Sequence, residues 1–356
     1  MDNARITQCQ TEAVRSGAFP GAELLVGRAS DGDVLFHHAV GLAQKFPTEE
    51  PLSTSTIFDV ASVTKAVLTT TLVMQAVAEH RLNLDSRVAA FLPLFVGPQK
   101  ELVTVWHLLS HASGLPAWRP FFEAHRREPP AAARDAIRAA VAQEPLETRP
   151  GTRALYSDLS MILLGWIVET IGGERLDALG EKKIFAPLQL HNTFHAPTDA
   201  PLPRPASAFA ATENCPWRKQ VLRGRVHDDN CYVMGGVSGH AGLFSTTQDL
   251  FDFARALLRG QIVPRDIVDL FWTRSGVPGS DRALGWDTKS AQGSQAGSKI
   301  SPGSVGHTGF TGTSLWIDRT RDVIVVLLTN RVHPRRDNEL IKLWRPTIHD
   351  VVFSSL

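Results

Sequence analysis

Strand patterns at both ends of the chain, with helical patterns between them, constrain the fold more than any other feature of the sequence. The apolar stretches 22–27 and 34–41 are separated by a turn that contains Asp-Gly, which predicts a β-hairpin. Near the other end, stretches 313–317 and 323–329 flank a polar turn and predict a second hairpin. We expect the strands of both ends to complete one antiparallel sheet.

The middle of the chain has the apolar spacing of helices, with two irregular segments. Helices are predicted over residues 63–80, 131–143, 158–170 and 247–258. Two segments read as loops, the proline-rich residues 196–225 and the Gly- and Ser-rich residues 287–303. We therefore expect a discontinuous α/β (α+β) sheet lobe of residues 1–60 and 243–356, into which a mainly helical lobe of residues 61–242 is inserted.

Charge and hydropathy narrow the class of partner. The 356 residues include 37 Lys and Arg against 36 Asp and Glu, a balance that gives no overall field for nucleic acid or anionic lipid. The longest apolar runs stop far short of the ~20 residues that cross a bilayer, and the start resembles no signal peptide. We expect a small-molecule substrate, no nucleic-acid or membrane partner, and a cytoplasmic location. The oligomeric state is left open.

Neither a metal nor another cofactor is expected. The three cysteines are odd in number and irregularly spaced, so they form neither a disulfide framework nor a CxxC site. His107 and His111 have the spacing of a helical metal pair, but the H-E-x-x-H pattern is absent and no third ligand is evident.

The sharpest local motif is Ser62-Val63-Thr64-Lys65, which lies where an extended segment meets a predicted helix. Residues three apart share one face of a helix, so the Lys65 ammonium can fold back onto the Ser62 hydroxyl and pair a nucleophile with a base. Free backbone N–H groups at a helix start also stabilise negative charge on an acyl oxygen. An N-cap serine followed by a surface lysine would give the same letters.

Two further elements favour the chemical interpretation. Tyr156 stands in a turn just before a helix, and a phenol near a lysine ammonium can have its pKa lowered, which suits a general base or proton relay. The motif His307-Thr308-Gly309 enters a predicted strand, where the glycine lets a substrate lie against the strand edge. Each element alone also fits a packed aromatic or an ordinary strand.

In this order, the three motifs resemble those of the serine β-lactamase and penicillin-binding-protein (DD-peptidase) superfamily. Residues 62–65 match S-x-x-K, residues 156–158 are similar to the Tyr-x-Asn form of the second motif, and residues 307–309 are similar to the His variant of the third. These forms are typical of the class C β-lactamase and esterase branch. The resemblance extends over most of the chain, including residues 108–115, 150–151, 239–245 and 284–286.

The resemblance implies a β-lactamase-like fold and an acyl-enzyme mechanism. Ser62 would attack a carbonyl while Lys65, assisted by Tyr156, accepts its proton. The backbone N–H groups of Ser62 and Phe310 would hold the oxyanion, and Asp158, His307, Thr308 and Gly309 would contact the substrate.

Two positions depart from the family's pattern. Asp158 stands where asparagine is usual, so it presents a carboxylate, and it could pair with Lys65 and keep that side chain charged. His307 replaces a permanently charged lysine, so contact with a substrate carboxylate should depend on pH near its reference pKa of ~6.5.

The sequence therefore indicates a serine hydrolase acting on ester, β-lactam or D-amino-acid peptide bonds. An acyltransferase or transpeptidase could use the same acyl-enzyme. An inactive homologue that only binds ligands on the same scaffold is the other alternative.

Overall fold

The strands form one large sheet and two small ones. Their bounds are β1 (Gly21–Arg28), β2 (Val34–Gln44), β3 (Glu50–Pro51), β4 (Phe58–Asp59), β5 (Phe194–His195), β6 (Asn214–Cys215), β7 (Gln220–Val221), β8 (Leu243–Ser245), β9 (Asp287–Thr288), β10 (Val305–Thr308), β11 (Ser314–Asp318) and β12 (Val323–Thr329). The computed structural model describes all residues, 1–356. The large sheet has the order β3-β2-β1-β12-β11-β10-β9, and the small sheets are β4-β8-β5 and β6-β7.

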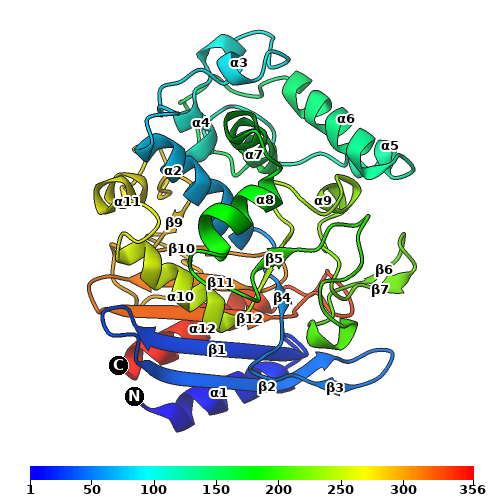
Figure 1. Cartoon of the computed structure of the whole chain (residues 1–356). Helices are drawn as coiled ribbons and strands as arrows, with labels where there is room; N and C mark the ends of the chain where they lie inside the picture. The colour runs from blue at the N-terminus through cyan, green and yellow to red at the C-terminus, as the bar shows by residue number, and fades with distance from the viewer.

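The large sheet joins the two ends of the chain. All its neighbouring strands are antiparallel. In its centre β1 pairs with β12 over the whole of β1 except its first residue, from Ala22 opposite Thr329 to Arg28 opposite Val323 (Figure 1). Both predicted hairpins are present, and the expected antiparallel sheet built from both chain ends is confirmed.

The helices cover the sheet and build the upper part of the molecule in Figure 1. The α-helices are α1 (Asn3–Arg15), α2 (Thr71–Ala78), α3 (Val88–Phe91), α4 (Val105–Leu109), α5 (Phe122–His125), α6 (Pro130–Gln143), α7 (Asp158–Gly172), α8 (Leu176–Gly180), α9 (Asp229–Val233), α10 (Thr247–Leu258), α11 (Arg265–Trp272) and α12 (Ile341–Ser354). Shorter turns are η1 (Lys65–Thr70) and η3 (Glu181–Phe185), both π-helical, and the 3-10 helices η2 (Lys100–Leu102) and η4 (Ala206–Ala208). None of them combines the length and apolar character that crossing a membrane requires.

Both faces of the central strands are buried, because side chains alternate along a strand. Leu24 and Val26 of β1 belong to an apolar cluster with α1 and α12. Leu25, between them, belongs to the larger cluster that includes α10. This double burial explains why β12 reads as the unbroken apolar run VIVVLL rather than as an alternating strand.

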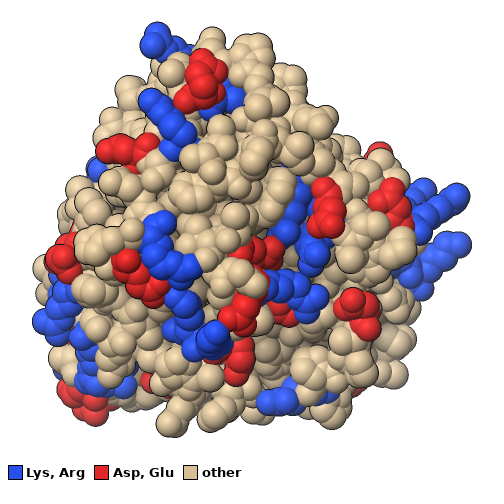
Figure 2. Space-filling view, turned by 45° about the horizontal axis from the view of Figure 1, so that its top comes forward, with Lys and Arg blue, Asp and Glu red and all other residues tan.

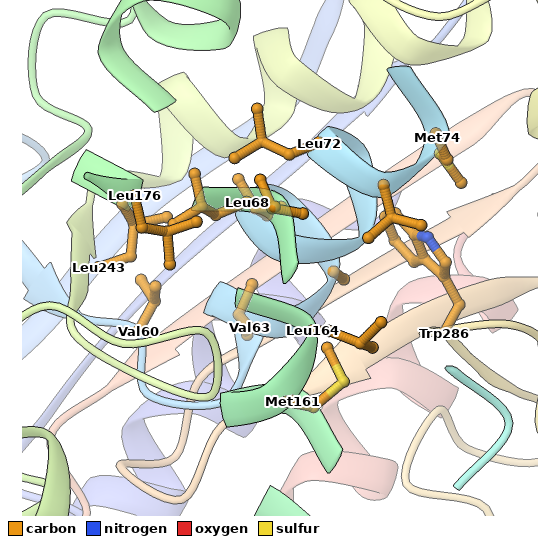
Figure 3. Packing of buried hydrophobic residues seen from close by; sticks show 14 of the residues in the cluster. Val60, Val63, Leu68, Leu72, Met74, Met161, Leu164, Leu176, Leu243 and Trp286 are labelled. Atoms are coloured by element: carbon orange, nitrogen blue, oxygen red, sulfur yellow. The ribbon is translucent and has the colours of Figure 1, made fainter. Parts of the chain in front are cut away.

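The larger apolar cluster continues from the sheet into the helical part of the chain and fixes the surroundings of Ser62. Figure 3 shows Leu68 of η1 packed near Leu176 of α8 and Leu243 of β8. Val60 and Val63, on either side of Ser62 in the sequence, are fully buried in the same cluster. The nucleophile candidate is therefore held between two anchored residues.

The predicted helices agree with the structure except at the first one. The predictions over residues 131–143, 158–170 and 247–258 match α6, α7 and α10 closely. The predicted continuous helix over residues 63–80 is instead divided into η1 and α2, and a π-helical segment of this kind often marks a functional site.

The two predicted loops each contain short regular structure. Residues 196–225 include η4 and the hairpin of β6 and β7, and residues 287–303 begin with β9. These two- and three-residue elements are too short to produce a periodic pattern. The division of the chain into lobes at residues 60 and 243 stays a prediction.

One close backbone contact brings the loop before β8 against helix α7. A Cβ atom at Gly239 would lie 2.2 Å from the Met161 carbonyl oxygen, so only glycine fits there. Thr69 of η1 donates a hydrogen bond to the Gly239 carbonyl at 2.7 Å. The contact therefore fixes the loop that carries His240 relative to both η1 and α7.

Replacing this glycine should destabilise the protein. We expect Gly239→Ala to cost ~1–3 kcal/mol, because the added methyl group overpacks a rigid backbone contact. Thermal unfolding measures the effect. The matched control is Gly303→Ala, where a Cβ meets no atom within 4 Å and which should leave the midpoint unchanged. Equal midpoints for both variants would contradict this account.

Candidate active site

Ser62 follows a tight turn whose backbone is held by a buried carboxylate. Ala61 has a φ of 46°, in the left-handed region that is uncommon for residues with a side chain. Asp59 accepts hydrogen bonds from the backbone N–H of Ala61 at 2.9 Å and of His227 at 2.6 Å. Burial raises the pKa of Asp59. Asp59, which the sequence analysis missed, is thus a structural support of the turn that presents Ser62.

Lys65 is fully buried and its ammonium nitrogen contacts three oxygen atoms. Nζ lies 2.7 Å from Ser62 Oγ and 2.8 Å from the His240 carbonyl oxygen. It also lies 2.8 Å from Asp158 Oδ1. The structure thus brings together Ser62 and Lys65 as the motif spacing suggested, and the carboxylate of Asp158 joins them.

The chemistry of these three partners fixes what Lys65 can do. A carbonyl and a carboxylate only accept hydrogen bonds, whereas a serine hydroxyl can also donate one. When Lys65 is charged, its three N–H groups match three acceptors. When it is neutral, His240 and Asp158 occupy its two N–H groups, so its lone pair can face only Ser62. The site is therefore arranged for proton transfer between Ser62 Oγ and Lys65 Nζ.

Asp158 keeps Lys65 charged in the resting site. Burial by itself lowers the pKa of Lys65, but the negative charge of Asp158 and the proximity of Tyr156 outweigh it and raise the pKa above its usual value. The alternative that Asp158 pairs with Lys65 instead of acting as an amide donor agrees with this geometry. The neutral, basic form of Lys65 is consequently a minor species at neutral pH.

Tyr156 lies at the mouth of α7, next to the lysine. Its ring centroid is 5.0 Å from Lys65 Nζ and 4.8 Å from the guanidinium of Arg282. Ser157, the N-cap of α7, accepts a hydrogen bond from the Ser160 N–H at 3.2 Å and fixes the start of the helix. The structure thus places Tyr156 beside the other two predicted catalytic residues.

The expected lowering of the Tyr156 pKa is not what the structure gives. Burial raises the pKa of Tyr156 and outweighs the opposing attraction of Lys65. At neutral pH the side chain is a phenol, and it suits proton donation better than proton abstraction. The sequence indicated a cation near the phenol, but it could not indicate how strongly the folded chain shields the phenol from water.

His307 on β10 also differs from its expected charge state. Its Nδ1 lies 2.9 Å from the Thr308 carbonyl oxygen, and because a carbonyl only accepts, Nδ1 must carry the proton. Burial lowers the pKa of His307 to about 4. The ring is therefore neutral across pH 5–8 in the protein without substrate, where its pKa lies below the reference value of ~6.5.

The turn after β10 packs against the Val60 carbonyl, two residues before Ser62, and contains a second free N–H group. A Cβ at Gly309 would lie 2.5 Å from the Val60 carbonyl oxygen, so glycine is required for this close approach. Thr313 donates a hydrogen bond to that same carbonyl at 3.0 Å. The backbone N–H groups of Ser62 and Phe310 have no acceptor within the protein. These two donors are the pair that the family resemblance implied for an oxyanion.

All the predicted site residues except the fully buried Lys65 line one cavity of about 680 Å³. The sequence analysis missed much of its wall, in particular Trp118, Arg282, Asp287, Arg331, Arg336 and Arg345. No local spacing marks these residues, because they come from separate loops and elements. Figure 2 shows both signs of charge interspersed over the face it presents, and the cavity itself is lined by carboxylates as well as cations.

Two histidines that flank the site have defined positions. His240 is held by its ring, which lies 2.9 Å from Asp228 Oδ1, while its carbonyl contacts Lys65. His227 lines the cavity and its ring stacks on Phe310 with a centroid distance of 5.7 Å. His240 thus acts on the site through its backbone, and His227 through the position of the Phe310 side chain.

Comparisons with known proteins agree with this geometry. The profile of the Beta-lactamase family matches residues 6–346. The chain is 31% identical to the N-acetylmuramyl-L-alanine amidase of Bacillus subtilis (strain 168), covering 93% of this chain and 84% of the relative. It is also 31% identical to an Escherichia coli (strain K12) protein named "Putative D-alanyl-D-alanine carboxypeptidase", covering 88% and 79%.

Solved structures share the fold. EstCE1, described as a hydrolase with promiscuous acyltransferase activity, superposes with a TM-score of 0.75 at 23% identity, covering 98% of both chains. The octameric penicillin-binding protein homologue from Pyrococcus abyssi gives a TM-score of 0.74 at 22% identity, covering 93% of this chain and 74% of that one.

The contact between Asp158 and Lys65 predicts a shift in the pH profile. Because the carboxylate raises the pKa of Lys65, Asp158→Asn should lower it and increase the neutral amine at a given pH. We expect the rising alkaline limb of kcat/KM for a neutral ester to move ~1 unit or more toward lower pH.

The profile is measured between pH 6 and 10. Asp135→Asn is the control, since the Asp135 side chain on α6 is 71% exposed and contacts only Arg134. A limb that stays at the same pH in Asp158→Asn would show that the carboxylate does not control the charge of Lys65.

Proposed function

Because this chain belongs to the Beta-lactamase family, we propose that it is a serine hydrolase that forms an acyl-enzyme on Ser62. The observation that carries the proposal is the position of Ser62 Oγ, 2.7 Å from Lys65 Nζ. The backbone N–H groups of Ser62 and Phe310 are also free to bind an oxyanion. A nucleophile, its base and an oxyanion site are the three requirements of acyl transfer.

The proposed acylation step assigns separate proton roles to Lys65 and Tyr156. Ser62 Oγ bonds to the substrate carbonyl carbon while neutral Lys65 accepts the hydroxyl proton. The N–H groups of Ser62 and Phe310 stabilise the resulting oxyanion. The bond to the leaving group then breaks, and the Tyr156 phenol donates its proton to the departing oxygen. Lys65 returns a proton to Tyr156, and water later releases the acyl group.

Carboxylic esters are the proposed substrate class, ahead of D-amino-acid peptides and β-lactams. Asp158 places a carboxylate where an amide N–H would be needed to bind a lactam or peptide side chain. His307 is neutral, so it offers no fixed positive charge to a substrate carboxylate. Both features favour a neutral ester. The relatives named as an amidase and a carboxypeptidase keep D-amino-acid amides as the next class to test.

Acyl transfer to an alcohol or amine is the second candidate. The cavity of about 680 Å³ is large enough to admit an acceptor beside an acyl group. The similar structure EstCE1 is described as having promiscuous acyltransferase activity. Incubation with an ester and a competing alcohol distinguishes the two, because transfer yields a new ester whereas hydrolysis yields only the acid.

Replacing the nucleophile should abolish turnover and leave folding intact. We expect Ser62→Ala to lower kcat for phenyl acetate by ~10³-fold or more, because the other groups act only through the serine. Intact mass spectrometry of quenched wild-type enzyme should show one acetyl group, and the variant should show none. The same assay with a penicillin tests the β-lactam class.

Ser55→Ala is the matched control, since Ser55 is an exposed serine in the turn before β4. It should keep the wild-type rate and the adduct. Undiminished turnover by Ser62→Ala, or an adduct on it, would overturn the acyl-enzyme proposal. A wild-type protein that binds esters without turnover or adduct would favour the inactive binding homologue.

A further inference from the structure

A buried arginine of the last helix contacts the turn after β10 at the active site. Arg345 of α12 is 5% exposed, and no carboxylate lies within 4 Å of its guanidinium. Its Nη1 donates a hydrogen bond to Gln295 Oε1 at 3.1 Å, and Nη2 donates to the carbonyl oxygens of Gly309 at 3.3 Å and Thr313 at 3.2 Å. A buried cation without an anionic partner is costly to the fold, so its retention calls for a physical role.

The Gly309 carbonyl belongs to the same peptide group as the Phe310 N–H. A peptide group is planar and its carbonyl and N–H are conjugated, so a hydrogen bond to the carbonyl strengthens the N–H as a donor. The cationic guanidinium gives a stronger hydrogen bond than a neutral donor does. Arg345 therefore orients and polarises the peptide whose N–H is one of the two proposed oxyanion donors.

The neighbouring hydrogen bonds show which groups hold this peptide and the turn around it. Arg331 donates from Nε to the Phe310 carbonyl at 2.7 Å, and so acts on the next peptide along the chain. The Gly309 N–H is itself bound to the Thr313 carbonyl at 2.7 Å. The Gly309 carbonyl also accepts a hydrogen bond from the Gly312 backbone N–H at 3.0 Å, and Arg345 adds the side-chain hydrogen bond to this carbonyl, the only one that carries a positive charge.

Gln295 keeps the guanidinium in place. Pro346 lies inside α12 and lacks an N–H, so the Lys342 carbonyl one turn earlier is released from the helix. The Gln295 side chain donates to this carbonyl at 3.4 Å and accepts from Arg345. The glycine- and serine-rich segment that contains Gln295 thereby connects α12 to the active site.

We propose that Arg345 is a positioning residue of the oxyanion hole, which holds and polarises the Gly309–Phe310 peptide so that the Phe310 N–H stabilises the tetrahedral intermediate. This inference rests on the proposed acyl-enzyme route through Ser62. It assigns to the last helix a role in the rate of the reaction rather than in the recognition of a substrate charge.

The test compares transition-state and ground-state binding in Arg345→Met. We expect kcat for phenyl acetate to fall ~10- to 100-fold, somewhat less than the loss of a whole oxyanion donor, while KM changes little. The affinity for a neutral trifluoromethyl ketone, which adds Ser62 to form a tetrahedral oxyanion, should fall by a similar factor. A neutral amide that binds without reacting should keep its affinity.

Further variants separate positioning from folding. Arg345→Gln keeps an N–H donor without the charge and should lose less activity than Arg345→Met; it decides the question if the methionine variant does not fold. Arg321→Met is the control, because Arg321 also donates a hydrogen bond to a backbone carbonyl, that of Phe353 at 2.8 Å, but lies outside the cavity. It should leave both kinetic constants unchanged.

Two outcomes would overturn the inference. One is unchanged trifluoromethyl ketone affinity and kcat in folded Arg345→Met or Arg345→Gln. The other is a rise in KM confined to substrates that carry a carboxylate, which would make Arg345 a direct anion contact. Failure of the proposed function looks different, because wild-type enzyme would then form no adduct on Ser62 at all.

Discussion

The burial of one positive charge governs how the site is assembled. A fully buried ammonium is tolerated only where hydrogen-bond acceptors replace its hydration, and an unpaired one costs several kcal/mol. Lys65 obtains its acceptors from three separate parts of the chain, the serine turn, the start of α7 at Asp158 and the loop at His240. These segments must converge for the lysine to be buried. The fold and the reactive centre are therefore specified together.

The local environment sets the charge of each group in a way that residue identity does not. Lys65 and His307 are both buried near the same cavity, but Lys65 stays charged beside a carboxylate, whereas burial leaves His307 neutral. Tyr156 remains a phenol for the same reason. A charged lysine, a neutral imidazole and a neutral phenol give a site that releases and returns protons without carrying a large net charge.

Much of the fold was predictable because local patterns carry it. The two hairpins and helices α6, α7 and α10 follow from apolar periodicity and turn residues, and the spacing from Ser62 to Lys65 predicted their contact. The arginines were not predictable. Arg345 acts on a carbonyl 36 residues away, and no periodicity records which backbone groups a long side chain will reach. The π-helical η1 was also missed, because its sequence is that of an ordinary helix.

Because the active site draws on both ends of the chain, its parts are synthesised at different times. Ser62 and Lys65 are synthesised early, but the strand that carries His307, the Phe310 N–H and the helix with Arg345 come last. β12 must also pair with β1 before the sheet is complete. A chain still emerging from the ribosome therefore has the proposed nucleophile with only one of its two proposed oxyanion donors, and the proposed site is complete only when the final segment has docked.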